Sequence, residues 1–270
     1  MNFADQIKEL LSFNVRNLAE HNDGPFRIFT APARNVCCIA VPVTAKSMEE
    51  AAMQTYQLEN LIHSLDKSSK RIIITEDLWN RSKECTAARL LAQFGQFRPI
   101  FARNTKASRI SKTESAAFLR NFHTYGDASA RYRYGLFDKE GTMVAVAYFS
   151  SARTWRKEDK TIRSYEWVRY ASLPDTRVIG GMGKILKAFI NDVRPDDIMS
   201  YADCEWTEGD VYERLGFIKE SFRTPVAFIV DDTTWERKPV SLDSYNESSN
   251  IDHCRYHINL GSIKYRFRIL

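Results

Sequence analysis

The sequence predicts a mixed α/β protein that consists of two domains. Segments with an apolar residue at every third or fourth position alternate with short apolar runs, a pattern typical of helices that cover a sheet. Two strand-like segments flank a short turn that contains glycine, which indicates that part of the sheet is an antiparallel hairpin. The length of 270 residues is large for one domain and sufficient for two.

Composition and charge exclude several classes of protein. Hydrophobic residues make up 44% and charged residues 27% of the chain, which is a globular and not a disordered composition. No apolar run approaches the ~20 residues that a transmembrane helix needs, and the first residues lack the apolar segment of a signal peptide, so we expect no membrane partner. The five cysteines are scattered and odd in number, as expected for reduced thiols in a cytoplasmic protein. The net charge of +5 permits an anionic partner without requiring one.

Residues 1–97 are expected to form a small α/β domain. Ser47 and Glu50 have the spacing of a helix capping box, and the strands are short apolar runs. In chain order we expect a helix over 3–18, a strand over 36–43, a helix after Ser47, a strand over 71–75 and a helix over 78–95. No catalytic motif lies in this domain, so the sequence does not indicate its role.

Residues 98–270 are expected to form the second domain. Ser111 and Glu114 form another capping box, and Gly141 lies in the turn of the predicted hairpin. The expected elements are strands over 100–110, 131–138, 143–151, 164–173, 197–203 and 225–232, helices over 112–123, 184–193 and 211–217, an exposed loop over 241–250 and a closing hairpin over 258–270.

A glycine-rich turn, "RVIGGMGKILK" over 177–187, joins a strand to an amphipathic helix. The amide N–H groups at the start of a helix lack partners and face the positive end of its dipole, so they bind phosphate well. Glycine also lets the backbone approach a bulky anion. The turn is therefore either a phosphate site or an ordinary junction between a strand and a helix.

The spacing of the glycines distinguishes between phosphate-binding motifs. A Walker A loop needs a glycine at Val178 and Ser or Thr at Ile185, and a dinucleotide fingerprint needs a small residue at Leu186, so both fail. The remaining pattern is [QR]-x-x-G-x-[GA], and Gly181-Met182-Gly183 supplies its G-x-G. Val178 occupies the position of its Gln or Arg, whereas Arg177 lies one residue early.

A second motif follows at the expected distance. Tyr212, Gly216 and Phe217 match a Y-x-x-x-G-F segment that comes after the next strand and a short helix. With these two motifs, residues of about 100–240 resemble the GNAT (GCN5-related N-acetyltransferase) superfamily. The resemblance implies a GNAT-like fold and transfer of an acetyl or similar acyl group from acetyl-CoA, or another acyl-CoA, to a small-molecule or macromolecular amine.

A narrower likeness concerns segments such as 134–150 and 200–217. They look like phage-associated GNAT-like proteins, a group similar in this region to the Mom DNA-modification protein of bacteriophage Mu. This likeness implies an alternative function, modification of a nucleic-acid base. A second alternative is a GNAT-like module that binds without catalysis, which the departure at Val178 favours and the intact Tyr212 opposes.

The resemblance also implies roles for individual residues. Tyr212 would be the general acid that protonates the leaving thiolate. The backbone would supply the remaining donors. The implied pyrophosphate ligands are the amides of Ile179, Gly180, Gly181, Met182 and Gly183 with the charge of Lys184 or Arg177, and the implied donors to the acyl carbonyl are the amides of Ala171, Ser172 and Leu173.

Three side chains are candidates for the base that accepts the amine proton. Glu166 lies on the strand before the turn, Asp203 ends the next strand, and His123 ends the helix that lines the acceptor side in such folds. Each also has an ordinary interpretation as a solvated or helix-capping residue. Strand alternation predicts that Tyr165, Trp167 and Arg169 share one face, whereas Glu166 and Val168 share the other.

Two further groups of residues are candidates for binding. His253, Cys254 and His257 alternate along a strand and lack the partners of a tetrahedral site, so no metal is predicted. A second group interleaves aromatic and basic side chains, as either a nucleic-acid surface or a solvated hairpin tip would. It consists of Tyr132, Tyr134, Arg153, Trp155 and Arg156.

Overall fold

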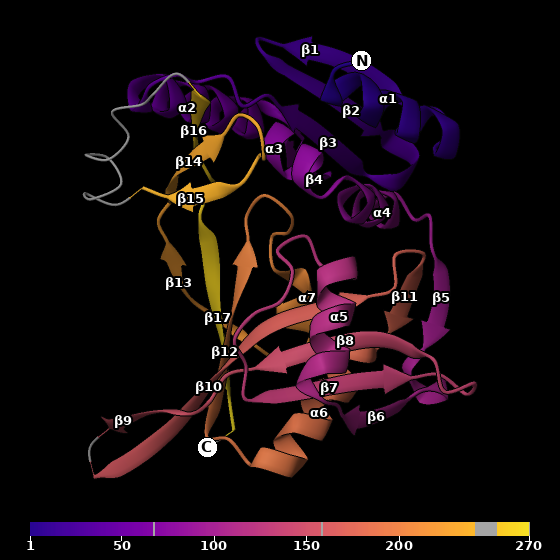
Figure 1. Cartoon of the computed structure of the whole chain (residues 1–270), viewed down its shortest axis with the longest axis vertical. Helices are drawn as coiled ribbons and strands as arrows, with labels where there is room; N and C mark the ends of the chain where they lie inside the picture. The colour runs from indigo at the N-terminus through magenta and orange to yellow at the C-terminus, as the bar shows by residue number, and fades with distance from the viewer. Residues whose placement is uncertain (67, 158, 241–252, 270) are drawn as a thin grey trace. The chain divides into compact units, whose positions relative to one another are not determined.

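The computed structural model of the chain describes residues 1–66, 68–157, 159–240 and 253–269 (Figure 1). The chain forms two compact units, and the mixed α/β class predicted from the sequence is confirmed. The first unit contains residues 1–95, 203–208 and 222–262, and the second contains 96–202, 209–221 and 263–270. The predicted loop over 241–250 lies outside the described residues. Within the described part of the chain, no helix is both long and apolar enough to cross a bilayer.

A four-stranded sheet forms the centre of the first unit. Its order is β1-β2-β3-β4, with β3 and β4 parallel and the other pairs antiparallel. Its elements are α1 (Phe3–Asn14), β1 (Ala19–Asp23), β2 (Phe26–Ala31), β3 (Val36–Val41), α2 (Met48–Ser64), β4 (Lys70–Thr75), α3 (Glu76–Arg81) and α4 (Lys83–Gln93). All residues of β3 are buried because helices cover both faces of the sheet. Cys38 packs with α1 and α4, whereas Ile39 packs with Leu58 and Leu61 of α2.

Residues from the far end of the chain complete the first unit. Strands β14 (Ala227–Asp231), β15 (Arg237–Pro239) and β16 (Cys254–Ile258) form a three-stranded sheet, and Tyr256 packs against Ala45 and Ala51. The sequence places 222–262 in the second domain, but this segment packs with the first unit because its apolar side chains are buried there. The predicted closing hairpin is wrong, since β16 pairs with β14 and the next strand joins another sheet.

A cluster of buried charges holds these distant segments together. Arg237 is 6% exposed and donates to Thr75 at 2.6 Å and to the carboxylate of Asp77, which is fully buried. Its guanidinium also lies 3.9 Å from Glu205, which contacts His257 at 3.3 Å. Burial alone would raise the pKa of Asp77, but Arg237, His257 and the Thr75 hydroxyl together hold it below its ordinary value.

The second unit is built on an eight-stranded mixed sheet. Its order is β13-β17-β12-β10-β8-β7-β6, and β9 pairs with β10. Its elements are β5 (Arg98–Phe101), β6 (Lys106–Arg109), α5 (Lys112–Phe122), β7 (Tyr132–Phe137), β8 (Met143–Phe149), β9 (Arg153–Lys157), β10 (Lys160–Ser172), β11 (Thr176–Ile179), α6 (Gly181–Val193), β12 (Asp197–Asp203), α7 (Asp210–Arg214), β13 (Ile218–Arg223) and β17 (Ser262–Arg268). The predicted hairpin is confirmed as β7 and β8, and the capping box of α5 is present at Ser111 and Glu114.

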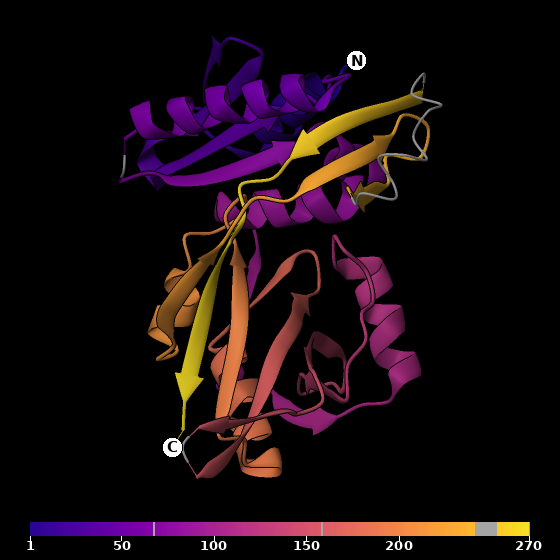
Figure 2. The ribbon, with the colours of Figure 1, turned by 90° about the vertical axis from the view of Figure 1, so that its left-hand side faces the viewer.

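Helices cover both faces of this sheet. Tyr148 of β8 packs with α5, whereas its neighbour Phe149 stacks on Phe189 of α6 with ring centroids 3.9 Å apart. Figure 2 shows α5 beside one face of the sheet. Alternation along β8 therefore separates an α5 side of the sheet from an α6 side.

We predict that Arg237→Leu destabilises the protein by about 3–5 kcal/mol, because it leaves the carboxylates of Asp77 and Glu205 buried without a cation. Urea denaturation measures the free energy of unfolding, and Arg16→Leu, at an exposed position of the same unit, is the matched control. A loss below about 1 kcal/mol for Arg237→Leu would contradict this role.

Candidate active site

The two edges of strand β10 are paired over different lengths. One edge pairs with β9 over residues 160–164 and with β8 over 167–172, whereas the other edge pairs in parallel with β12 only over 164–166. The hydroxyl of Ser200 donates to the carbonyl of Trp167 at 2.9 Å, and beyond this bond the described structure has no further pairing between β10 and β12. Half of β10 therefore has a free edge inside the sheet.

The free edge presents two amide donors. The N–H of Leu173 donates to the carbonyl of Val144 at 3.0 Å, so the N–H of Ala171 also faces β8 by alternation. The N–H groups of Tyr170 and Ser172 then point away from β8. Of the three amides expected to contact an acyl carbonyl, the geometry leaves that of Ser172 available.

The first turn of α6 carries unpaired amide donors. Gly180 is the N-cap with φ of 78°, a left-handed conformation that favours glycine. The first backbone hydrogen bond of the helix runs from the N–H of Lys184 to the carbonyl of Gly180. The N–H groups of Gly181, Met182 and Gly183 have no acceptor among the described residues, as expected for a helix start. They form a positively polarised end without a side-chain cap.

Close contacts fix this turn between two other elements. A Cβ on Gly181 would lie 2.8 Å from the hydroxyl oxygen of Tyr170 and 2.9 Å from Val178. A Cβ on Gly183 would lie 3.3 Å from Leu215, the residue that follows α7. The start of α6 therefore packs between the end of β10 and the end of α7, and its glycines have a packing reason of their own.

Tyr212 is held on α7 by its aromatic neighbours. Its ring stacks on that of Tyr265, with centroids 5.3 Å apart, and lies edge-on to Phe217. The N–H of Phe217 donates to the carbonyl of Tyr212, and Gly216 reverses the chain with φ of 88°, which explains the Y-x-x-x-G-F spacing. The hydroxyl groups of Tyr212 and Ser200 share a hydrogen bond of 2.9 Å, so the Tyr212 hydroxyl lies where β10 and β12 cease to pair.

The two predicted cations have partners within the protein. The ammonium group of Lys184 donates to the carbonyl of Ala102 at 2.8 Å and to that of Thr105. The guanidinium of Arg177 lies over the ring of Phe97. Val178 is 6% exposed and pairs with β5, so a core strand residue occupies the position of the motif's Gln or Arg. Valine therefore replaces the Gln or Arg of the motif at position 178 because this residue packs in the core.

A β-bulge corrects the predicted faces of β10. Tyr165 and Trp167 pack in the core with α6, as alternation predicts. The register shifts between Trp167 and Arg169, and the extra residue turns Arg169 to the α5 side, next to Tyr125. The prediction that Arg169 shares a face with Trp167 is therefore wrong. Burial lowers the pKa of Arg169, although nearby Glu166 counteracts this.

The other predicted bases have local hydrogen bonds. His123 caps the end of α5, and its Nδ1 accepts from the N–H of Tyr125 at 3.1 Å. Asp203 accepts from the N–H of Glu205 at 3.0 Å, and its carbonyl accepts from the N–H of Trp206. Asp203 thus shapes the turn over 203–208 and belongs to the first unit, whereas Glu166, Arg169 and His123 belong to the second.

The structure brings some predicted residues together and adds others. The end of β10 with Ser172, the turn over 179–183 and α7 with Tyr212 lie close together. Tyr170 contacts Gly181, Leu215 contacts Gly183 and Ser200 bonds to Tyr212, and the sequence indicates none of these three partners. A hydroxyl that bridges two strands has no sequence signal, because its partners lie far along the chain. Over the described residues, no group of three or more His, Cys, Asp or Glu side chains is placed to hold a metal ion.

Comparison with known proteins identifies similar folds. No protein-family model matches the chain, and no curated protein matches it. A structure of the spermidine/spermine N-acetyltransferase SpeG from Vibrio cholerae is 9% identical with a TM-score of 0.41, and the match covers 62% of this chain and 94% of that one. The NatC complex bound to Gag peptide and CoA gives 14% identity, a TM-score of 0.38, and coverage of 62% and 99%.

A third similar structure is the ribosomal-protein-S18-alanine N-acetyltransferase from Escherichia coli. It is 15% identical with a TM-score of 0.35, and the match covers 61% of this chain and 94% of that one. These TM-scores lie below 0.5, so the three matches do not assign a function to this chain.

We predict that Gly181→Ala destabilises the protein by about 1–3 kcal/mol, because the new methyl group overlaps Tyr170 and Val178. Gly183→Ala should change stability by less than about 1 kcal/mol, since the helix gains propensity and the flexible side chain of Leu215 can move aside. Urea unfolding of both variants tests this difference. Equal stability of the two variants would show that the contacts at Gly181 are unimportant.

Proposed function

We propose that the second unit transfers an acyl group from a coenzyme A thioester to an amine. The observation that carries this proposal is the convergence of three parts: the free edge of β10, the unpaired amides of α6 and the hydroxyl of Tyr212. Each part would supply one requirement of acyl transfer. The edge of β10 would polarise the carbonyl, the amides of α6 would bind the donor, and the hydroxyl of Tyr212 would be the acid for the leaving group.

The start of α6 suits the pyrophosphate of the donor. The N–H groups of Gly181, Met182 and Gly183 lack protein acceptors and stand at the positive end of the helix dipole. Backbone donors carry most of this interaction in the proposal, because Lys184 is bonded to carbonyl oxygens elsewhere. The amide-bearing arm of the thioester would then extend along the free edge of β10, as an added strand does.

The chemistry follows from the donors at that edge. When a neutral amine attacks the thioester carbonyl, negative charge develops on its oxygen, and the N–H of Ser172 is available to stabilise it. Collapse of the intermediate breaks the carbon–sulfur bond, and the thiolate takes the hydroxyl proton of Tyr212. Glu166 or His123, both in the second unit, would accept the proton that the amine loses, directly or through water.

We predict that Gly183→Asp weakens the binding of acetyl-CoA and free CoA at least tenfold. The added carboxylate repels pyrophosphate, whereas an acidic residue in the first turn of a helix does not destabilise it. Isothermal titration calorimetry measures the affinity. Asn191→Asp adds the same charge to the far end of α6 and should bind as the parent does. Absence of any binding by the folded parent protein would refute the proposed donor.

We predict that Tyr212→Phe lowers kcat by about 10²–10⁴-fold and leaves the affinity for CoA unchanged. The fold should persist because the ring still stacks on Tyr265, and Ser200 keeps its bond to Trp167. Release of free thiol from acetyl-CoA in the presence of a panel of amines measures turnover. A variant with parental turnover would remove Tyr212 from the mechanism. Donor binding without turnover in the parent would favour a non-catalytic module.

A further inference from the structure

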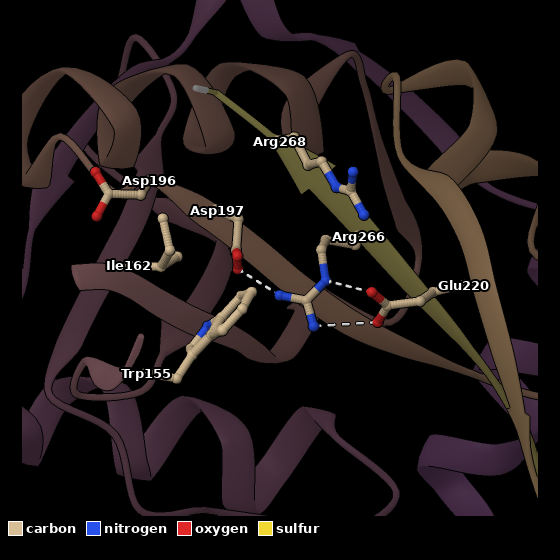
Figure 3. A pocket seen from close by; sticks show the side chains of 7 residues that line it. All are labelled: Trp155, Ile162, Asp196, Asp197, Glu220, Arg266 and Arg268. Atoms are coloured by element: carbon tan, nitrogen blue, oxygen red, sulfur yellow. Dashed lines mark hydrogen bonds and ion pairs between the residues drawn. The ribbon is translucent and has the colours of Figure 1, made fainter. Parts of the chain in front are cut away.

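A pocket lies at the amino-terminal end of β12 in the second unit (Figure 3). Its volume is about 140 Å³. It is lined by Trp155, Ile162, Asp196, Asp197, Glu220, Arg266 and Arg268. The hydroxyl of Tyr212 lies next to Ser200 in the middle of β12, and none of the residues that form the candidate active site lines this pocket, so the two sites are separate.

The three carboxylates of this pocket are already paired. Asp196 accepts from the backbone N–H of Arg163 at 2.7 Å and lies 3.5 Å from its guanidinium. The guanidinium of Arg266 donates to Asp197 at 2.7 Å and makes two bonds to Glu220, at 2.7 and 3.1 Å, as the dashed lines in Figure 3 show. Hydrogen bonds from Arg266 hold the pKa of Glu220 at about 2. These bonds lie in the guanidinium plane, and the Arg266 side chain, which is 12% exposed, forms part of the pocket lining.

Other groups at the pocket have no such partner. The indole of Trp155 is 43% exposed. Trp155 lies on the hairpin of β9 and β10, where it pairs across the two strands with Ile162. Arg268 is exposed and pairs with no carboxylate of the described residues. The pocket thus combines an exposed aromatic ring, that of Trp155, with a cation, Arg268, that forms no ion pair with a carboxylate of the described residues.

The hairpin of β9 and β10 carries further exposed cations next to the pocket. Arg153, Arg156 and Lys160 are exposed, and none forms an ion pair within the described ranges. The aromatic and basic group predicted from the sequence therefore divides in two. Tyr134 is 2% exposed and Tyr132 packs against the same core, whereas Arg153, Trp155 and Arg156 lie on the surface.

We propose that this pocket and hairpin bind single-stranded nucleic acid. One base would enter the pocket beside Trp155 and the face of Arg266, while Arg268 and the hairpin cations contact the flanking phosphates. The volume suits one planar ring, since a buried cavity of about 150 Å³ accepts benzene. In a duplex the bases are stacked inside, and an acidic peptide has no planar group for the pocket, so both fit less well. The inference does not depend on the proposed acyl transfer.

The test uses labelled single strands of thymidine and of uridine, a DNA duplex of equal length and polyglutamate. Fluorescence anisotropy measures their affinities at 50 and 200 mM salt. We expect both single strands to bind more tightly than the duplex and polyglutamate, with affinity that falls as salt rises and quenching of tryptophan emission on binding. Trp79, Trp167 and Trp206 are buried and Trp235 is half-buried in the first unit, so quenching that is lost when Trp155 is replaced by alanine would report stacking on Trp155.

The double variant Trp155→Ala/Arg156→Glu should bind single strands at least tenfold more weakly. Its matched control is Phe13→Ala/Arg16→Glu, which changes the charge equally at an exposed aromatic and an exposed arginine of the first unit, and it should bind as the parent does. Circular dichroism checks that both variants fold. The proposal is overturned if the parent binds no single strand, if the duplex or polyglutamate binds as tightly, or if both double variants lose the same affinity.

Discussion

The short pairing of β10 with β12 is the constraint on which the second unit depends. A strand inside a sheet normally bonds to neighbours on both sides, because unpaired backbone groups lose hydrogen bonds. Here β10 bonds to β12 over only three residues, 164–166, whereas its other edge pairs with β9 and then, with a β-bulge after Trp167, with β8 as far as Ser172. The amides of Tyr170 and Ser172 are therefore left to bind water or a ligand. The same bulge directs Arg169 to the α5 side, next to Tyr125.

The glycines of the α6 turn satisfy two requirements at once. Gly180 adopts a left-handed conformation, and Gly181 leaves no room for a methyl group next to Tyr170. Both properties would be needed even if nothing were bound. They also keep the helix start free of side chains, so its unpaired amides remain accessible to an anion. Packing and anion binding therefore both favour glycine at these positions, so a glycine motif alone does not show which of the two roles it serves.

The first unit depends on a different constraint, the pairing of buried charges. Asp77 follows β4, Glu205 lies in the turn after β12, and Arg237 and His257 come from the late strands. Burying any one of these groups alone would cost several kcal/mol. The cluster is therefore stable only when four distant segments assemble together, which links residues 222–262 to a unit formed mainly by the first 95 residues.

The sequence by itself determined many of the local elements and the two motifs, although it did not indicate β1, β2 or β9 and predicted one helix where the structure has α3 and α4. Apolar spacing and capping boxes predicted α1, α2 and α5, short apolar runs predicted β3 and β4, and the turn at Gly141 predicted the hairpin of β7 and β8. These features depend on residues a few positions apart, so they can be read directly from the chain. The glycine turn and Tyr212 were found for the same reason.

Only the tertiary structure decided which of these residues meet. The bulge in β10, the bond from Ser200 to Tyr212 and the contact of Gly183 with Leu215 depend on residues that the fold brings together. The same holds for the carbonyl oxygens that bind Lys184 and for the strand that buries Val178. Neither the assignment of 222–262 to the first unit nor the pocket beside Trp155 has a local signal, because both are made of segments far apart in the chain.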